Sequence, residues 1–214
     1  MSGRKTMLIR AVGLLALFCL FTLAVALVDV RAIGPNGGEV GFSAVNGAFA
    51  SLVGVHMSWY EFTELLGLLP LLAVACFGLT GLIQLVKRKS LKKVDREILC
   101  LAGLCVVLAV LYVGFEVLAL NFRPVLLDGV AEPSYPSSHT LLFVSVLGAA
   151  VILLRRRMSP GTLRTAVQAV LWAVILLGVV GRTISGVHWL TDIVGSLLLS
   201  AGLLALYEGM LQTK

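Results

Sequence analysis

Two of the three histidines stand beside residues that could assist phosphate chemistry. His188 precedes Asp192 by four residues, so on a helix the two side chains would share one face. Asp192 could then accept the proton of one ring nitrogen of His188 and leave the other nitrogen free to attack. His139 follows residues 136–138, a proline and two serines that are typical of a helix N-terminus. These residues could supply a nucleophile, a carboxylate that orients it and a proton donor.

Two arginines accompany the histidines. Arg123 and Arg182 are permanent cations whose planar forks fit phosphate oxygens. The free N–H groups of a helix beginning near Ser137 would also point at an anion. Two arginines, a helix N-terminus, two histidines and one carboxylate make a site for phosphoryl transfer without a metal ion. One histidine would attack phosphorus, and the other would give a proton to the leaving oxygen.

The chain as a whole is too apolar for a water-soluble protein. Of its 214 residues, 59% are hydrophobic and 13% are charged, whereas soluble domains carry roughly 25% charged residues. The net charge of +6 is typical of basic loops that face anionic lipid. We therefore expect a membrane bilayer as a partner and no nucleic acid. All four cysteines lie in apolar runs without metal-binding spacing, and we interpret them as buried apolar side chains: Cys19, Cys76, Cys100 and Cys105.

Six apolar segments approach the length of about 20 residues that a membrane-spanning helix needs. They cover residues 8–28, 62–86, 98–120, 139–154, 165–183 and 190–209. The first could be a signal peptide, but its apolar run is long and no clean cleavage site follows, so we interpret it as an anchor. The sequence thus predicts an all-α bundle of six transmembrane helices, forming one domain over residues 1–214. Between the first two spans, residues 40–55 favour an interfacial or re-entrant helix.

The basic residues predict the orientation of this bundle. With the N-terminus in the cytoplasm, 14 of the 17 Lys and Arg residues are cytoplasmic, including Lys214. The three others, Arg31, Arg123 and Arg182, lie outside. Both termini are then cytoplasmic, and the polar stretches that carry the arginines and histidines meet at the outer face. We expect a bacterial plasma membrane, because the chain is compact and has no targeting extension.

Three polar stretches together resemble the signature of the type-2 phosphatidic acid phosphatase family, which is related to vanadium haloperoxidases. The family pattern reads K-x6-R-P, then P-S-G-H, then S-R-x5-H-x3-D. The resemblance covers roughly residues 116–192, and the six-span layout fits the rest. The matching residues are, in motif order, Arg123-Pro124, then Pro136-Ser137 with His139, then Arg182, His188 and Asp192.

This resemblance implies a role for each matching residue. His188 would be the nucleophile that forms a phosphohistidine, Asp192 would hold it, and His139 would be the general acid. The substrates of the family are lipid phosphates and diphosphates, including phosphatidate, phosphatidylglycerophosphate and undecaprenyl diphosphate. No metal or organic cofactor is implied. The residues expected to bind the substrate phosphate are Arg123, Arg182, Ser137 and Ser138.

The chain departs from the family pattern at three positions. Glu116 stands where the first motif has lysine, and it is a possible modulator of the site. A carboxylate there would repel phosphate unless it is protonated at membrane depth or paired with Arg123. Ser138 replaces the glycine of the second motif, and Gly181 replaces the serine of the third.

Other polar residues on the outer side have simpler interpretations. We interpret His56 as a surface residue of the long loop. Glu61 and Glu64 are interpreted as caps at a helix boundary, with a substrate gate as the alternative. Asp128 and Glu132 belong to a solvated loop beside the site, or else tune its specificity.

The leading prediction is a lipid phosphatase that acts on the extracytoplasmic face through a phosphohistidine. Two alternatives stay open. The first is a catalytically weak or dead relative that binds lipid phosphates, which Glu116 and Gly181 would explain. The second is a small membrane transporter, which charged or broken helices within the membrane would favour. Pro70 is the one notable proline inside a span.

Overall fold

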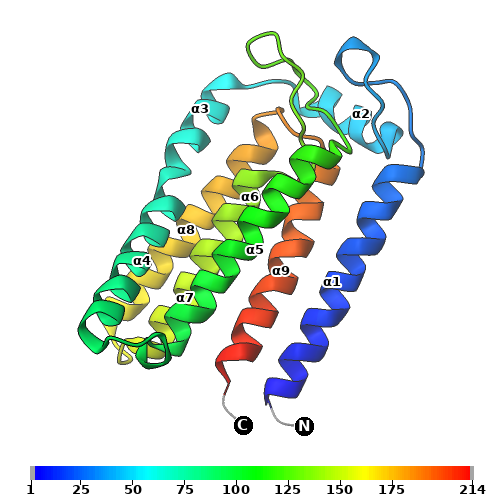
Figure 1. The fold of residues 1–214 in the computed structure, drawn as a ribbon. Coiled ribbons are helices and arrows are strands. Elements are labelled where there is room, and N and C mark those ends of the chain that lie inside the picture. Colours follow the sequence, from blue (N-terminus) through cyan, green and yellow to red (C-terminus); the bar gives the residue numbers. More distant parts are fainter. Residues whose placement is uncertain (1–2, 213–214) are drawn as a thin grey trace.

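The computed structural model describes residues 3–212, and these residues form a bundle of helices (Figure 1). Six helices are long and apolar enough to cross a membrane, as the hydropathy pattern predicts. The spanning elements are α1 (Gly3–Leu27), α3 (Met57–Leu66) with α4 (Leu68–Arg88), α5 (Arg96–Leu118), α6 (Ser138–Leu142) with the π-helical turn η3 (Phe143–Leu147) and α7 (Gly148–Arg157), α8 (Thr162–Ile184) and α9 (Leu190–Leu211). The prediction of an all-α, six-helix membrane fold is confirmed.

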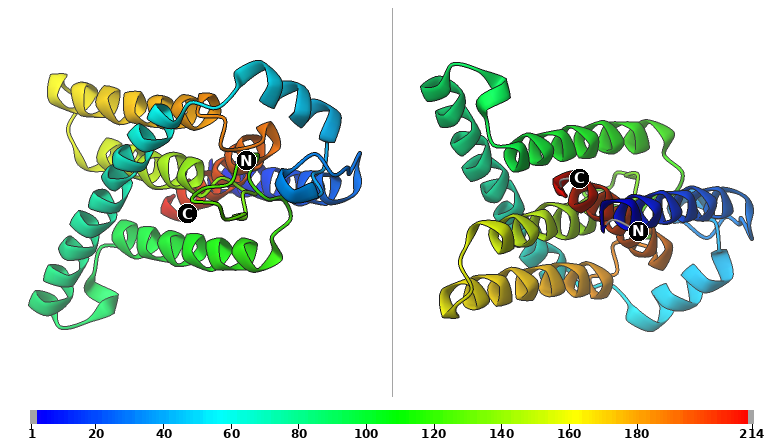
Figure 2. Two further views of the ribbon diagram at one scale, coloured as in Figure 1. Left: turned by 90° about the horizontal axis from the view of Figure 1, so that it is seen from above. Right: turned by 90° about the horizontal axis from the view of Figure 1, so that it is seen from below.

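Three short elements connect the spans. They are η1 (Pro35–Gly37), α2 (Ser43–Val53) and η2 (Leu91–Lys93). The helix α2 falls within the region 40–55, where the sequence favours a helix outside the main spans. It lies across the end of the bundle, close to the N-terminal end of α3 (Figures 1 and 2).

The spans alternate in direction, so α1 begins and α9 ends at the same end of the bundle (Figure 1). The loops that connect α4 to α5 and α7 to α8 lie at that end too. These loops and the adjoining helix ends carry ten of the 17 Lys and Arg residues, whereas the three motif stretches lie at the opposite end. Lys214, assigned to the basic side, lies outside the described residues.

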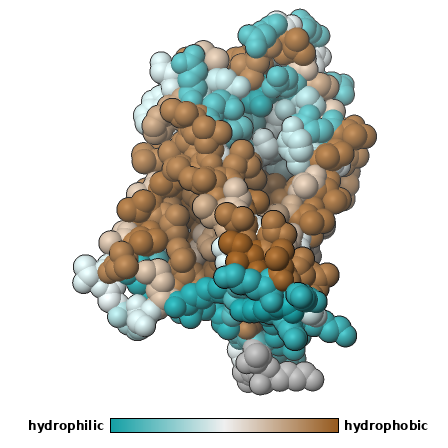
Figure 3. Space-filling view, turned by 60° about the vertical axis from the view of Figure 1, so that its left-hand side comes forward, coloured by the Kyte–Doolittle hydropathy of each residue, from teal (hydrophilic) through white to brown (hydrophobic). Residues whose placement is uncertain are grey.

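The face of the molecule drawn in Figure 3 carries a broad apolar belt between two hydrophilic ends. Large apolar side chains on the belt are exposed, such as Val117 at 80% and Val106 at 63%. Exposure of so many apolar side chains would be unfavourable in water. In a bilayer it is favourable, because lipid tails are as apolar as the side chains. The exposed belt therefore supports a position within a membrane.

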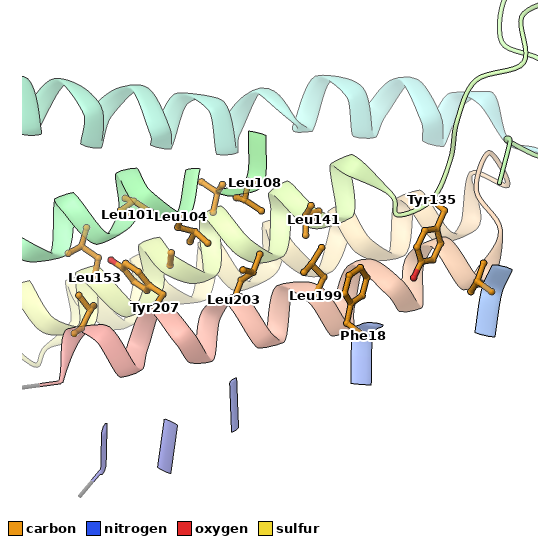
Figure 4. Packing of buried hydrophobic residues seen from close by; sticks show 14 residues of the cluster. Phe18, Leu101, Leu104, Leu108, Tyr135, Leu141, Leu153, Leu199, Leu203 and Tyr207 are labelled. Carbon is orange, nitrogen blue, oxygen red and sulfur yellow. The ribbon is translucent and has the colours of Figure 1, made fainter. Parts of the chain in front are cut away.

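Two spans form the interior of the bundle. In α9 and in the span from Ser138 to Arg157, 61% of the apolar segment is buried, against 11–22% in the other four. Both interior spans carry a motif stretch at or near their N-terminal ends. Their side chains pack with α5 in one cluster, in which Leu101, Leu153 and Leu203 lie together (Figure 4). Packing on all sides fixes these two helices more firmly than the lipid-facing ones.

Helix α1 packs along α9, and small residues allow the close approach. A Cβ placed on Gly202 would lie 2.7 Å from Leu15 Cδ2 and 3.3 Å from the backbone nitrogen of Leu15. The second contact involves backbone, so a side-chain rotation alone cannot relieve it. Gly202 therefore sets the distance between the first and last spans.

Gly202→Leu should lower the free energy of unfolding by about 1–3 kcal/mol, because the added side chain forces α1 away from α9. Gly103→Leu is the matched control, since a Cβ on Gly103 in α5 meets nothing within 4 Å. Thermal unfolding of both variants in the same detergent measures the difference. Equal stabilities would show that the α1–α9 spacing is not tight.

Candidate active site

The N-terminus of α9 brings His188 and Asp192 together. Asp192 is fully buried, and its Oδ2 accepts a hydrogen bond from the backbone N–H of Trp189 at 3.0 Å. The same oxygen lies 3.4 Å from Nδ1 of His188. His188 belongs to the turn before the helix and not to the helix itself, yet the predicted pairing is present. Asp192 thus caps α9 and orients the imidazole.

The second ring nitrogen of His188 faces an arginine. Nε2 lies 3.4 Å from Nη1 of Arg123, which can only donate. Nε2 is therefore the acceptor nitrogen, and Nδ1 carries the proton that Asp192 accepts. Burial of the imidazole, followed by the charges of Arg123, Arg182 and His139, lowers the pKa of His188 well below its ordinary value. His188 is therefore a neutral base, and the free lone pair of its Nε2 faces Arg123, a side chain of the kind that binds phosphate.

Arg123 is held by a hairpin-like loop between α5 and α6. Its backbone N–H donates to Glu132 O at 2.9 Å, and its side-chain Nε donates to Glu132 Oε2 at 3.0 Å. The tip of the loop turns at Gly129, where φ is +77°. The arginine side chain is only 11% exposed. The loop fixes its direction, so Nη1 stays beside His188.

Arg182 lies in the last turn of α8, and its side chain is completely buried. Nη2 donates to Glu64 Oε1 of α3, and the guanidinium lies over the ring of Tyr60 at 5.0 Å. Nε and Nη1 have no hydrogen-bond partner among the described residues. A buried cation with unused donors is suited to binding an anion with several oxygens.

The start of α6 supplies the second histidine. Ser137 is the N-cap of α6, because its Oγ accepts the N–H of Thr140 at 3.5 Å. Its backbone carbonyl accepts from the hydroxyl of Ser196 in α9 at 2.9 Å, which joins the two motif-bearing helices. His139 Nε2 lies 3.3 Å from Glu64 Oε2, so Glu64 contacts both Arg182 and His139.

Two adjoining cavities reach Arg123, His139 and His188. The smaller has room for about one water molecule and is lined by Glu116, Arg123, Ser138 and His188, among others. The larger has a volume of about 430 Å³ and lies between α4, α5 and α6. Its lining is almost wholly apolar, with Ser138 and His139 at its polar end. The cavities share three lining residues, Tyr112, Ser138 and Leu141.

Comparison with known proteins relates the C-terminal part of the chain to a protein family. Residues 116–214 match the model of the PAP2 superfamily. The C-terminal part of the chain, which holds the three motif stretches, is therefore similar to the PAP2 superfamily. The PAP2 match begins at Glu116 and includes all three motif stretches.

The fold of the chain resembles that of a solved PAP2-type protein. The crystal structure of a transmembrane PAP2-type phosphatidylglycerolphosphate phosphatase from Bacillus subtilis aligns with 94% of both chains, at 18% identity and a TM-score of 0.55. At this identity the likeness concerns the fold. No curated protein sequence matches the chain.

Glu116 and Gly181, two of the departures from the PAP2 pattern, lie in different surroundings. Glu116 is exposed at the rim of the smaller cavity, and the ion pair that Arg123 makes within residues 3–212 is with Glu132 rather than Glu116. Gly181 is buried against α3, where an added Cβ would lie 2.5 Å from Thr63 Cγ2 and 3.3 Å from Trp59. A serine at position 181 would push α3 away from α8.

Several residues that support the candidate site cannot be found from the motifs alone. Asn46 of α2 is fully buried and bonds to Thr191 twice, to its backbone N–H at 3.2 Å and its hydroxyl at 2.9 Å. The indole of Trp189 donates to Phe122 O at 2.6 Å. The only signal for Asn46 is a polar residue in an apolar stretch. His56 is exposed, and its ring contacts the nearby carbonyl of Val53, as expected for a surface residue.

The loop that carries His188 is fixed from outside by the segment before α3. The backbone N–H of His56 donates to Ser185 O at 2.9 Å. Gly186 has a φ of +70°, and an added Cβ would lie well inside contact distance of Gly54 O. Only glycine satisfies both the backbone angle and the space at this position.

The ring of His188 should stay neutral as the pH falls from about 8 to about 6, because a lowered pKa moves protonation to more acidic pH. The chain has three histidines, so nitrogen-15 NMR of histidine-labelled protein should give few signals. We expect the His188 signals to report a protonated Nδ1 and a bare Nε2 throughout this range. The spectrum of His188→Gln assigns them, and titration near pH 6.5 would contradict the prediction.

Proposed function

We propose that this protein is a lipid phosphatase that transfers phosphate to His188 and then to water. The observation that carries the proposal is the placement of His188 Nε2 beside Arg123, with Asp192 behind the ring and the buried Arg182 near by. A neutral nucleophile and two cations are the minimum that attack on a phosphate group needs.

In the first step, Nε2 of His188 attacks phosphorus and the bond between phosphorus and the lipid oxygen breaks. Asp192 stabilises the positive imidazole that results, because it already accepts the Nδ1 proton. Arg123 and Arg182 compensate the charge on the phosphate oxygens. His139 gives its proton to the lipid oxygen that leaves.

In the second step, a water molecule attacks the phosphohistidine. His139, now without its extra proton, accepts one proton from the water as the new P–O bond forms. The bond between phosphorus and Nε2 breaks, inorganic phosphate leaves, and His188 returns to its neutral state with the proton on Nδ1. Ser137 caps the helix that carries His139, and Ser138 lies between the two cavities, where a phosphate oxygen can reach it.

The apolar cavity supports a lipid substrate. Its volume of about 430 Å³ suits part of one hydrocarbon chain, and its polar end is at His139, the proposed donor to the leaving oxygen. Substrates of this kind include phosphatidate, phosphatidylglycerophosphate and undecaprenyl diphosphate. The positive-inside rule supports a site on the extracytoplasmic face of a plasma membrane, because the basic loops lie at the opposite end.

Phosphate release from these three lipids in detergent tests the proposal. His188→Ala should lower the rate by about 1,000-fold or more, because it removes the imidazole that attacks phosphorus. His56→Ala is the matched control, since His56 is an exposed histidine at the same end of the molecule and should keep wild-type activity. Full activity of His188→Ala would exclude the phosphohistidine route.

A folded wild-type protein that binds these lipids but releases no phosphate would favour the inactive-relative alternative. The feature behind this alternative is Glu116 at the rim of the cavity that contains Arg123 and His188. Glu116→Lys should then restore turnover, because it supplies the cation of the family pattern.

Filling the apolar cavity should weaken the binding of long-chain lipids selectively. Ala109→Trp places an indole in the cavity and excludes about two methylene groups, which corresponds to a rise in KM of about tenfold. A soluble short-chain phosphate should be unaffected. Val110→Trp is the control, because Val110 is the next residue of α5 and is not among the cavity-lining residues. Equal changes for both substrates would place the lipid chain elsewhere.

A further inference from the structure

Glu64 connects the two halves of the proposed site. One carboxylate oxygen accepts from Nη2 of Arg182, and the other lies 3.3 Å from Nε2 of His139. Under the proposed function these two side chains face the phosphate group and the leaving oxygen. Glu64 therefore stands where an anion is needed and is not the simple boundary cap that its sequence position suggests.

The contacts of Arg182 indicate that a phosphate group could replace the carboxylate of Glu64. Arg182 is fully buried, but only one of its three guanidinium nitrogens contacts Glu64. Nε and Nη1 of Arg182 have no partner in the described part of the chain. A phosphate group presents more oxygens than a carboxylate and could occupy these donors. The side chain of Glu64 is 40% exposed and can turn toward solvent, whereas the side chain of Arg182 is fully enclosed.

The position of Glu64 is built into the packing of α3. Gly181 of α8 lets Thr63, the preceding residue, approach closely. Where α3 meets α4, Gly67 packs against the ring of His139, since an added Cβ would lie 2.8 Å from its Cδ2. The backbone on both sides of Glu64 is thus fixed against the helices that carry Arg182 and His139.

We propose that the carboxylate of Glu64 competes with phosphate for Arg182 and thereby weakens the binding of free inorganic phosphate. This inference rests on the proposed function. A carboxylate and a phosphate dianion repel each other strongly at contact distance, so they cannot both sit on Arg182. A lipid phosphate has an additional source of binding energy, because its hydrocarbon chain enters the apolar cavity. Inorganic phosphate lacks that energy and is displaced by Glu64 after each reaction.

The test is the dissociation constant of inorganic phosphate, measured by calorimetry on the full chain in detergent. Glu64→Gln removes the competing charge and keeps the shape, so phosphate should bind about tenfold more tightly. Glu61→Gln is the matched control, because Glu61 is exposed on the same helix and should leave the constant unchanged. Glu64→Asp withdraws the carboxylate by one methylene and should give an intermediate gain of about threefold.

A merely structural role for Glu64 predicts the opposite result, since loss of a partner for Arg182 would disturb the site and weaken phosphate binding. Unchanged or weaker binding in Glu64→Gln would overturn the proposal. If that variant does not fold, unchanged or weaker binding in Glu64→Asp decides the matter in the same way.

If the protein turns over a lipid phosphate, inhibition by inorganic phosphate gives a second measurement. In Glu64→Gln the inhibition constant of inorganic phosphate should fall about tenfold, together with a fall in kcat because product leaves more slowly and His139 loses its partner. The calorimetric arm needs no turnover. A wild type without phosphatase activity would refute the proposed function, and the binding series would still decide on Glu64.

Discussion

Arg182 keeps a permanent charge in a place that water does not reach, and the surrounding helices are arranged around that charge. Burying a cation is strongly unfavourable unless an anion and hydrogen bonds compensate it. Here the compensation comes from Glu64 and the face of Tyr60, both on α3. Since two of the guanidinium nitrogens still lack partners in the described structure, the compensation is incomplete. These two nitrogens are the donors that the proposed phosphate group would occupy.

Besides the buried Arg182, the candidate site depends on the N-terminus of α9. Asp192 caps this helix and orients His188 with one carboxylate oxygen, so the fold and the proposed chemistry depend on the same atom. Asn46 holds the adjacent Thr191 from α2. This explains why a short helix outside the main spans matters to a site at the start of α9.

The departures from the family pattern take on a physical meaning in this arrangement. The glycine at position 181 gives up a hydroxyl but allows α3 to pack on α8, and that packing brings Glu64 to Arg182. Glu116 lies at the rim of the cavity without pairing to Arg123 in the described structure. The chain thus places carboxylates, Glu64 and Glu132, on both of its phosphate-binding candidates.

The sequence by itself determined the membrane setting, the six spans and the spacing of His188 and Asp192. Hydropathy depends on composition along short segments, and a separation of four residues leaves little freedom in how two side chains meet. The tertiary structure alone decided which anion compensates Arg182, because Glu64 lies 118 residues away along the chain. That contact depends on how closely α3 crosses α8. The crossing distance is set by the size of the buried side chain at position 181, which neither periodicity nor motif spacing encodes.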